Sequence, residues 1–162
     1  MKLPAGRRAI LLLGLPLGLA AAGALAYTQL AAAAPKEVPD PGAGQHGPLL
    51  ALEERVINLQ PGGAYRYAKI GVTVELRPAS AAFYALTGEA RSTSEKEALT
   101  EHQADVPLLL DALGSVVSAE DSNKLTAPSG RDDLKKQLLA AARSLLGERD
   151  VLDIYFTDLV MQ

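Results

Sequence analysis

The chain has 162 residues, enough for one domain of ordinary size and an appendage, and its 48% apolar content excludes disorder throughout. It has no cysteine, which excludes disulfides, thiolate nucleophiles and cysteine-based metal sites. The net charge is −3, but 13 of the 16 basic and all 19 acidic residues lie from Lys36 onward, a net charge of −6 that argues against nucleic-acid binding.

Residues 9–34 carry no charge and are predominantly apolar. A helix through most of this stretch would be roughly 30 Å long at about 1.5 Å per residue, the thickness of a bilayer's hydrocarbon core. We therefore predict a single transmembrane helix here. Because Lys2, Arg7 and Arg8 precede it, the positive-inside rule predicts that residues 1–8 are cytoplasmic and that the remaining chain lies outside the cytoplasmic membrane.

A cleaved signal peptide is the competing interpretation, since small residues suited to cleavage occur at 24–26 and 32–34. The apolar run is longer than the roughly 7 to 15 residues of a secretory signal, which favours an uncleaved anchor. Gly14 and Gly18 have the spacing of a helix-packing motif, although small residues are common in membrane helices without any such role.

Residues 35–48 have too few large apolar side chains to form a core and too many prolines and glycines to be regular. We predict a flexible linker that holds an outer domain, residues 49–162, a few tens of ångströms from the membrane.

The outer domain is predicted to begin with a hairpin. A short strand is expected over residues 52–59, followed by a turn over residues 60–63. Apolar and polar residues then alternate over residues 69–77, which predicts a strand with one face in the core and one toward water. The short turn makes the pair antiparallel.

Two helices follow a stretch, residues 79–103, in which the pattern indicates only a short helical piece near Phe83. The first helix has its apolar face at Val106, Leu109, Leu110, Leu113, Val116 and Val117. The second is predicted to have Thr126 as N-cap and Pro128 in its first turn. Its apolar stripe is Leu134, Leu138, Leu139, Ala142, Leu145 and Leu146, and Gly147 ends it.

The last twelve residues, 151–162, are apolar and rich in β-branched and aromatic types, which predicts a terminal strand that must be paired and buried. Strict alternation puts Leu152, Ile154, Phe156, Asp158 and Val160 on the core face and Asp153, Tyr155, Thr157 and Leu159 on the other. The elements together predict an α+β domain, an antiparallel β-sheet covered by helices.

Little in the sequence indicates catalysis. His46 lies in the predicted linker and His102 in a polar stretch, so neither is well placed for a Ser-His-Asp arrangement. We expect no catalytic, cofactor-binding or metal site, because no group of His, Asp and Glu has ligand spacing. Asp153 and Asp158 are predicted on opposite faces of an apolar strand. Each is either an ordinary exposed carboxylate, a buried and hydrogen-bonded group, or a contact for a partner.

The end of the chain resembles the closing motif of the FliL family of flagellar basal-body-associated proteins in Val151, Tyr155, Phe156, Thr157, Val160 and Gln162. Upstream, the resemblance continues through Asn58, Leu59, Tyr67, Asp111, Gly130, Leu134 and Lys135. The order of cytoplasmic start, membrane helix, linker and outer domain is also that of the family. The chain departs from the family pattern at Leu110, Arg143 and Leu159.

The resemblance implies a non-enzymatic, single-pass component of the flagellar motor whose outer domain is similar to the stomatin (SPFH) fold. Its implied partners are the MotA/MotB-like stator proteins and further copies of itself, arranged as a ring around the stator's ion-channel unit. The alternatives are an exported or anchored binding module without a flagellar role, and an exported hydrolase.

Overall fold

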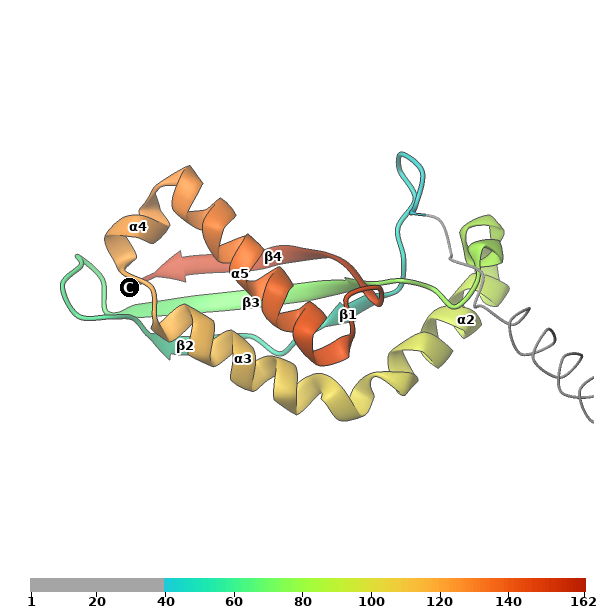
Figure 1. Cartoon of the computed structure of the whole chain (residues 1–162), viewed down its shortest axis with the longest axis horizontal. Coiled ribbons are helices and arrows are strands. Elements are labelled where there is room, and N and C mark those ends of the chain that lie inside the picture. The colour runs from blue at the N-terminus through green and yellow to red at the C-terminus, as the bar shows by residue number, and fades with distance from the viewer. Residues whose placement is uncertain (1–39) are drawn as a thin grey trace, which may run out of the picture. The chain divides into compact units, whose positions relative to one another are not determined.

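The computed structural model of the chain describes residues 40–162 (Figure 1). The strands are β1 (Leu49–Ala51), β2 (Arg55–Asn58), β3 (Tyr67–Leu76) and β4 (Val151–Met161). The helices are η1 (Ala81–Ala85), α2 (Gly88–Glu101), η2 (Gln103–Asp105), α3 (Val106–Ser118), α4 (Ser122–Thr126) and α5 (Pro128–Leu146).

The predicted cytoplasmic start, the transmembrane helix with Gly14 and Gly18, and the first part of the predicted linker all lie outside the described residues. Between residues 40 and 162, the structure contains no helix with the length and apolar character needed to cross a membrane.

The sheet is built around β3, which pairs antiparallel with β1 and β2 along one side and with β4 along the other. The predicted hairpin is confirmed, because β2 and β3 are joined by the turn that follows Leu59. The terminal strand is also paired as predicted, along the whole length of β3. The described part of the chain is therefore an α+β domain with an antiparallel sheet.

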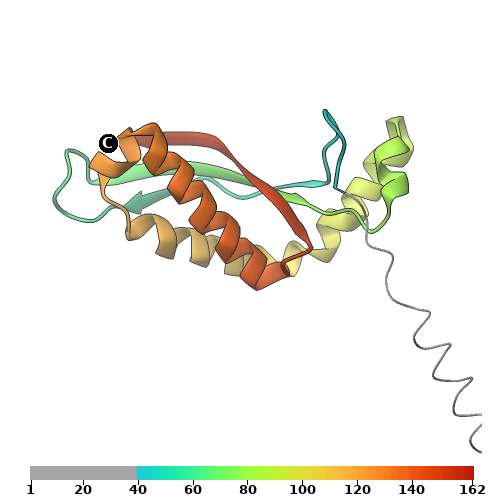
Figure 2. The same ribbon diagram turned by 45° about the horizontal axis from the view of Figure 1, so that its top comes forward.

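Helices α3 and α5 cover one face of the sheet (Figures 1 and 2). The core lies between these two layers. Its sheet side is formed by Ile70, Val72, Val74, Leu76, Val151 and Ile154. Its helix side is formed by Leu109, Leu113, Val117, Leu134, Leu138 and Ala142.

The regular spacing of apolar residues explains which faces are buried. On β3, every second residue from Ile70 points to the helices, as a strand's two-residue period requires. On α3 and α5, the buried side chains recur three or four residues apart, on one face. Leu145 is the exception to the predicted stripe, because 44% of it is exposed near the end of α5. Gly147 ends that helix with φ of 117°, as predicted.

The first predicted strand, residues 52–59, is wrong in its bounds. Pairing with β3 runs from Leu49, is interrupted after Ala51, and resumes at Arg55. Ala51 pairs with Thr73 and Arg55 with Ile70, so four steps along this edge match three along β3. One extra residue is accommodated as a bulge, which splits the strand into β1 and β2.

The predicted faces of the terminal strand are correct only from Asp153 to Phe156. At the start of the strand, Leu76 pairs with Val151 and Glu75 with Asp153, so Leu152 is an extra residue and Val151 lies in the core in its place. Val72 pairs with Phe156 and Gly71 with Asp158, so Thr157 is an extra residue without a partner. A one-residue slip exchanges the two faces of a strand. Beyond the bulge, Leu159 therefore packs against the core, whereas Asp158 and Val160 point away from the helices. Asp153 and Asp158 consequently share a face, contrary to the prediction.

Residues 79–103 contain more helix than predicted, because α2 has no buried residue and so no apolar period to reveal it. Thr126 is not the N-cap of the last long helix. It ends the short helix α4, and Ala127 precedes the first residue of α5, Pro128. The hydroxyl of Thr126 donates instead to the carbonyl of Asn123.

Candidate interaction surface

The face of the sheet opposite α3 and α5 carries no helix of the described chain (Figures 1 and 2). We call it the open face. Strand registers put Val56, Lys69 and Val160 in one row across it, from β2 through β3 to β4. Val56 is 68% exposed and Val160 is 45% exposed, and Tyr67, which pairs with Asn58 in the neighbouring outward row, is 46% exposed. Apolar side chains thus stand in solvent on both sides of Lys69.

The charge of Lys69 is matched within the face itself. Its Nζ lies 2.8 Å from Asp158 Oδ2 and 2.8 Å from Glu54 Oε2. These hydrogen bonds, that to Asp158 first, raise the pKa of Lys69, so it remains a cation. Asp158 lies on β4, and Glu54 lies in the interruption between β1 and β2, so the cluster joins both sides of β3. Its net charge is −1, between two apolar edges.

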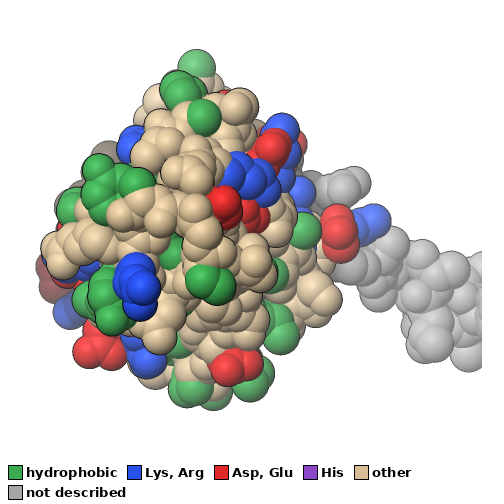
Figure 3. All heavy atoms as spheres, turned by 90° about the vertical axis from the view of Figure 1, so that its left-hand side faces the viewer, with side chains coloured by type: hydrophobic (Ala, Val, Ile, Leu, Met, Phe, Trp, Pro, Cys, Tyr) green, Lys and Arg blue, Asp and Glu red, His purple; other side chains and the backbone are tan. Residues whose placement is uncertain are grey.

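The surface continues around the end of the domain where the turn between β2 and β3 meets the carboxyl terminus. The backbone N–H groups of Arg66 and Tyr67 donate to the carbonyl of Gln162, which fixes the end of β4 against the start of β3. Tyr65, in that turn, is 41% exposed. Figure 3, which views this end, shows apolar side chains interspersed with charged ones. We refer to Val56, Tyr67, Lys69, Asp158 and Val160 as the open-face patch.

The opposite end of the open face is polar and more buried. Glu75, whose side chain points to this face from β3, is only 2% exposed. The hydroxyl of Tyr155 donates to Glu75 Oε2 over 2.5 Å. On β4, Asp153 accepts a hydrogen bond from Lys135 Nζ of α5 at 2.9 Å. The sheet end nearest α2 is therefore fastened by hydrogen bonds, whereas the patch at the other end exposes apolar surface.

The Tyr155–Glu75 bond gives the domain a pH dependence. The hydrogen bond, and burial after it, raise the pKa of Tyr155 from 10.0 to about 12, which favours the protonated phenol in the folded state. Its contribution to stability is complete below about pH 10 and is lost as the pH rises to about 12. In urea unfolding, we expect the stability difference between wild type and Tyr155→Phe to be constant up to about pH 10 and smaller at pH 12. A difference unchanged at pH 12 would contradict this.

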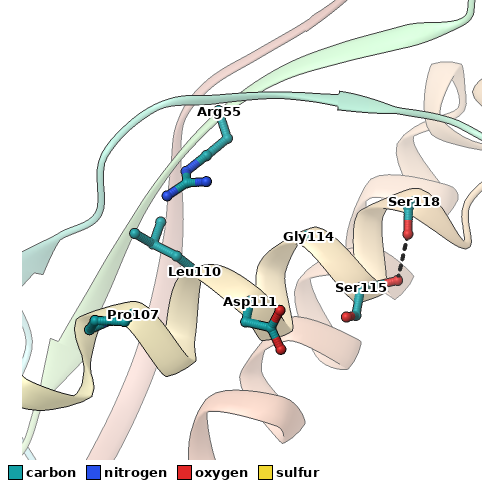
Figure 4. A pocket seen from close by; sticks show the side chains of 7 residues that line it. All are labelled: Arg55, Pro107, Leu110, Asp111, Gly114, Ser115 and Ser118. Carbon is teal, nitrogen blue, oxygen red and sulfur yellow. Dashed lines mark hydrogen bonds between the residues drawn. The ribbon is translucent and has the colours of Figure 1, made fainter.

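A hollow of roughly 560 Å³ lies between the β2 edge and the exposed side of α3 (Figure 4). Arg55 reaches down from β2 toward Leu110, and Asp111 lies one residue further along the helix. The remaining lining comes from Pro107, Gly114, Ser115 and Ser118. The hydroxyl of Ser118 donates to the carbonyl of Ser115, so it is already engaged.

The residues that carry the family resemblance fall into two groups. Those packed in or against the core are Leu59, Gly130, Leu134, Val151 and Phe156. Those on the open face or at its margins are Asn58, Tyr67, Tyr155, Thr157, Val160 and Gln162. Asp111 lines the hollow beside α3. Lys135, on α5, donates a hydrogen bond from Nζ to Asp153 of β4.

The histidines are engaged with carboxylates rather than with nucleophiles. His46 Nδ1 lies 3.5 Å from Glu75 Oε1, and His102 Nδ1 lies 3.4 Å from Asp105 Oδ2. Within residues 40–162, no three or more His, Asp and Glu side chains gather in a way that would hold a metal ion.

Comparison with known proteins agrees with this arrangement. The family model of the flagellar basal body-associated protein FliL matches residues 49–162, which are the sheet and all of its helices. The chain belongs to the FliL family. A curated FliL-family relative, the flagellar protein FliL of Aquifex aeolicus (strain VF5), is 30% identical over 107 residues. That match covers 66% of this chain and 56% of the relative, so the chain spans little more than half of the relative's length.

Sequence reasoning did not find several residues of this FliL-family domain that organise the open face. The sequence predicts Lys69 only as a polar residue of an alternating strand, and no pattern around Glu54 predicts its contact with Lys69. Glu75 was expected to face water, yet it is buried. The one available signal was that residues 74–76 place a carboxylate between two apolar residues of a central strand. Such a group needs partners if it is covered.

Proposed function

We propose that this FliL-family chain is a non-enzymatic component of the bacterial flagellar motor. It is anchored by one membrane helix, with its outer domain outside the cytoplasmic membrane and similar to the stomatin-like fold. It associates with the stator's ion-channel units, as a ring of copies, and supports torque. Family membership carries this proposal. The uncharged, apolar residues 9–34 and the basic residues before them support the topology.

The open-face patch is the surface through which we propose that neighbouring copies meet. Val56, Tyr67 and Val160 are all more than two-fifths exposed, and apolar groups clustered on a sheet face are a frequent mark of protein contacts. Lys69 is already paired with Asp158 and Glu54, so covering the patch leaves no unpaired cation. Anchoring confines the copies to one plane, which raises their effective concentration and allows a modest patch to suffice.

Charges introduced on the patch test this proposal. We expect Val56→Glu with Val160→Glu to abolish cross-linking between copies in the membrane and to reduce swimming at high viscous load by about tenfold or more. Two carboxylates would have to be buried, each costing several kcal/mol. Both side chains are exposed in the domain, so its thermal unfolding should change little.

Leu108→Glu is the matched control, since Leu108 is 55% exposed on α3, away from the open face. It should swim and cross-link normally. Normal cross-linking by the double variant would show that the copies meet elsewhere.

An anchored binding module without a flagellar role remains the second candidate, supported by the hollow beside α3. Deletion of the chain in its host separates the two. Impaired motility at high load, together with co-purification of the full chain with stator subunits, is the expected result. Unchanged motility and no stator contact would favour the second candidate.

A further inference from the structure

The end of the predicted linker is part of the folded domain. Gly47 and Pro48 are buried, and the backbone N–H of Leu76 donates to the carbonyl of Pro48 over 2.8 Å. Leu49 pairs with Glu75, so this bond continues the β1–β3 ladder by one residue toward the amino terminus. The chain entering the domain is thus joined directly to the central strand.

Glu75 fastens this segment from the side. Its Oε1 accepts the backbone N–H of Gly47 over 2.7 Å, and its Oε2 accepts the hydroxyl of Tyr155. The carboxylate is almost fully buried, so its removal would leave both donors without their partner. The buried carboxylate of Glu75 on the central strand therefore holds the backbone of the segment that enters the domain.

The position of Gly47 requires a residue without a side chain. A Cβ added there would lie 2.0 Å from the carbonyl oxygen of Leu76, which is a backbone atom of β3 and has little room to move. Any larger residue would push the segment away from the sheet. The contact is therefore specific for this sequence rather than a chance approach.

Two arginines hold the outer part of the segment. Arg91 of α2 donates from Nη2 to the carbonyl of His46 over 2.7 Å, and its guanidinium lies 3.9 Å from the centroid of the Phe83 ring. Arg77 Nη2 lies 2.7 Å from Asp40 Oδ1. Between these contacts, residues 42–45 form a turn closed by the bond from Gln45 N–H to the Gly42 carbonyl.

We propose that residues 40–48 form a strap, fastened by Glu75, that shortens the tether between the membrane and the domain. A linker of residues 35–48 would extend to about 46 Å at roughly 3.3 Å per residue, but residues 35–39 alone reach only about 17 Å. The strap therefore keeps the domain near the membrane and delivers any pull from the anchor to β3. The part that concerns height and pull rests on the proposed function; the fastened strap itself does not.

Spin labels on the full-length chain in lipid nanodiscs test the strap. The chain has no cysteine, so Ala43→Cys and Ala140→Cys provide one label on the exposed turn and one on α5. We expect a narrow distance distribution in the otherwise wild-type chain. Gly47→Ala and, separately, Glu75→Ala should make it about twofold broader and shift it to longer distances, because a freed chain of this length samples many separations.

Gly42→Ala is the matched control. Its added Cβ would meet only the flexible side-chain end of Gln45, at 3.3 Å, so the distribution should stay narrow. Circular dichroism melting accompanies each variant, and Tyr155→Phe removes one Glu75 partner without touching Gly47. A narrow, unshifted distribution in Gly47→Ala would overturn the proposal, and so would equal broadening in Gly42→Ala. A broadened distribution together with unchanged motility would retain the strap and overturn its role in height and pull, whereas deletion of the whole chain tests the motor role separately.

Discussion

We expect a chain that ends at Asp150 to lose the cooperative unfolding of its outer domain. Strand β4 supplies the whole partner ladder on one side of β3, from Leu76 to Ala68. It also supplies Val151 and Ile154 to the core. Its loss would leave one edge of the central strand unpaired and the core open on the same side.

The magnitude follows from the buried side chains. Fully burying an apolar side chain contributes about 1.5 to 3 kcal/mol, so Val151 and Ile154 alone contribute about 3 to 6 kcal/mol. Phe156, Leu159 and Met161, which pack against the core, add to this. A domain of this size has a total stability of only about 5 to 15 kcal/mol. The truncated domain should therefore be unfolded at ambient temperature.

Circular dichroism melting of the full chain and of a graded set of truncations measures this. Removing only Met161 and Gln162 takes away the last pairs with Ala68 and Tyr67, and should lower the melting temperature while keeping a single transition. A sharp transition in the chain ending at Asp150 would mean that the sheet folds without β4. The strand would then be a docking segment rather than part of the fold.

The second large effect is expected at Gly130. This residue is buried in the first turn of α5, and a Cβ added there would lie 1.9 Å from the carbonyl oxygen of Lys124 and 2.7 Å from its carbonyl carbon. Both atoms belong to the backbone of α4, so the short helix would have to move as a unit. We expect Gly130→Ala to reduce the free energy of unfolding by about 1 to 3 kcal/mol, as overpacking does.

Gly114→Ala provides a control of opposite sign. Gly114 also lies in a helix, α3, but no atom beyond its own helix and chain neighbours lies within 4 Å of the added Cβ. Alanine in a helix is favoured over glycine by about 0.5 to 1 kcal/mol, so this variant should be more stable than wild type. Urea unfolding of both measures the pair. Equal stability of the two variants would contradict the close approach of α4 to α5.

The sequence predicts the parts of this fold in which apolar spacing is regular. The alternation in β3 and the apolar faces of α3 and α5 each identified the right element and the right buried face. Helix α2 is not predicted, because none of its fourteen residues is fully buried and its sequence therefore shows no apolar period. The short helix α4 is not predicted either, because Thr126 and Pro128 match the N-cap and first turn of the following helix equally well.

The open face was harder to predict, because it depends on a single extra residue. Strict alternation assigns Val160 to the core and Leu159 to solvent, and the bulge at Thr157 reverses both. A bulge is hard to recognise from the sequence of a strand in which most residues are β-branched or aromatic. Gly71 on β3 leaves room for this bulge, since a Cβ there would lie 2.5 Å from the hydroxyl oxygen of Thr157. The strap was missed because proline and glycine content alone indicates a free linker.

The irregular edges of this narrow sheet also affect its tendency to aggregate. Edge strands invite further strands, and repeated addition leads to fibres and aggregates. Here one edge is interrupted by the bulge between β1 and β2, and at the other the guanidinium of Arg143 occupies the carbonyls of Val151 and Leu152. Endless strand-by-strand growth is therefore discouraged at both edges of the sheet.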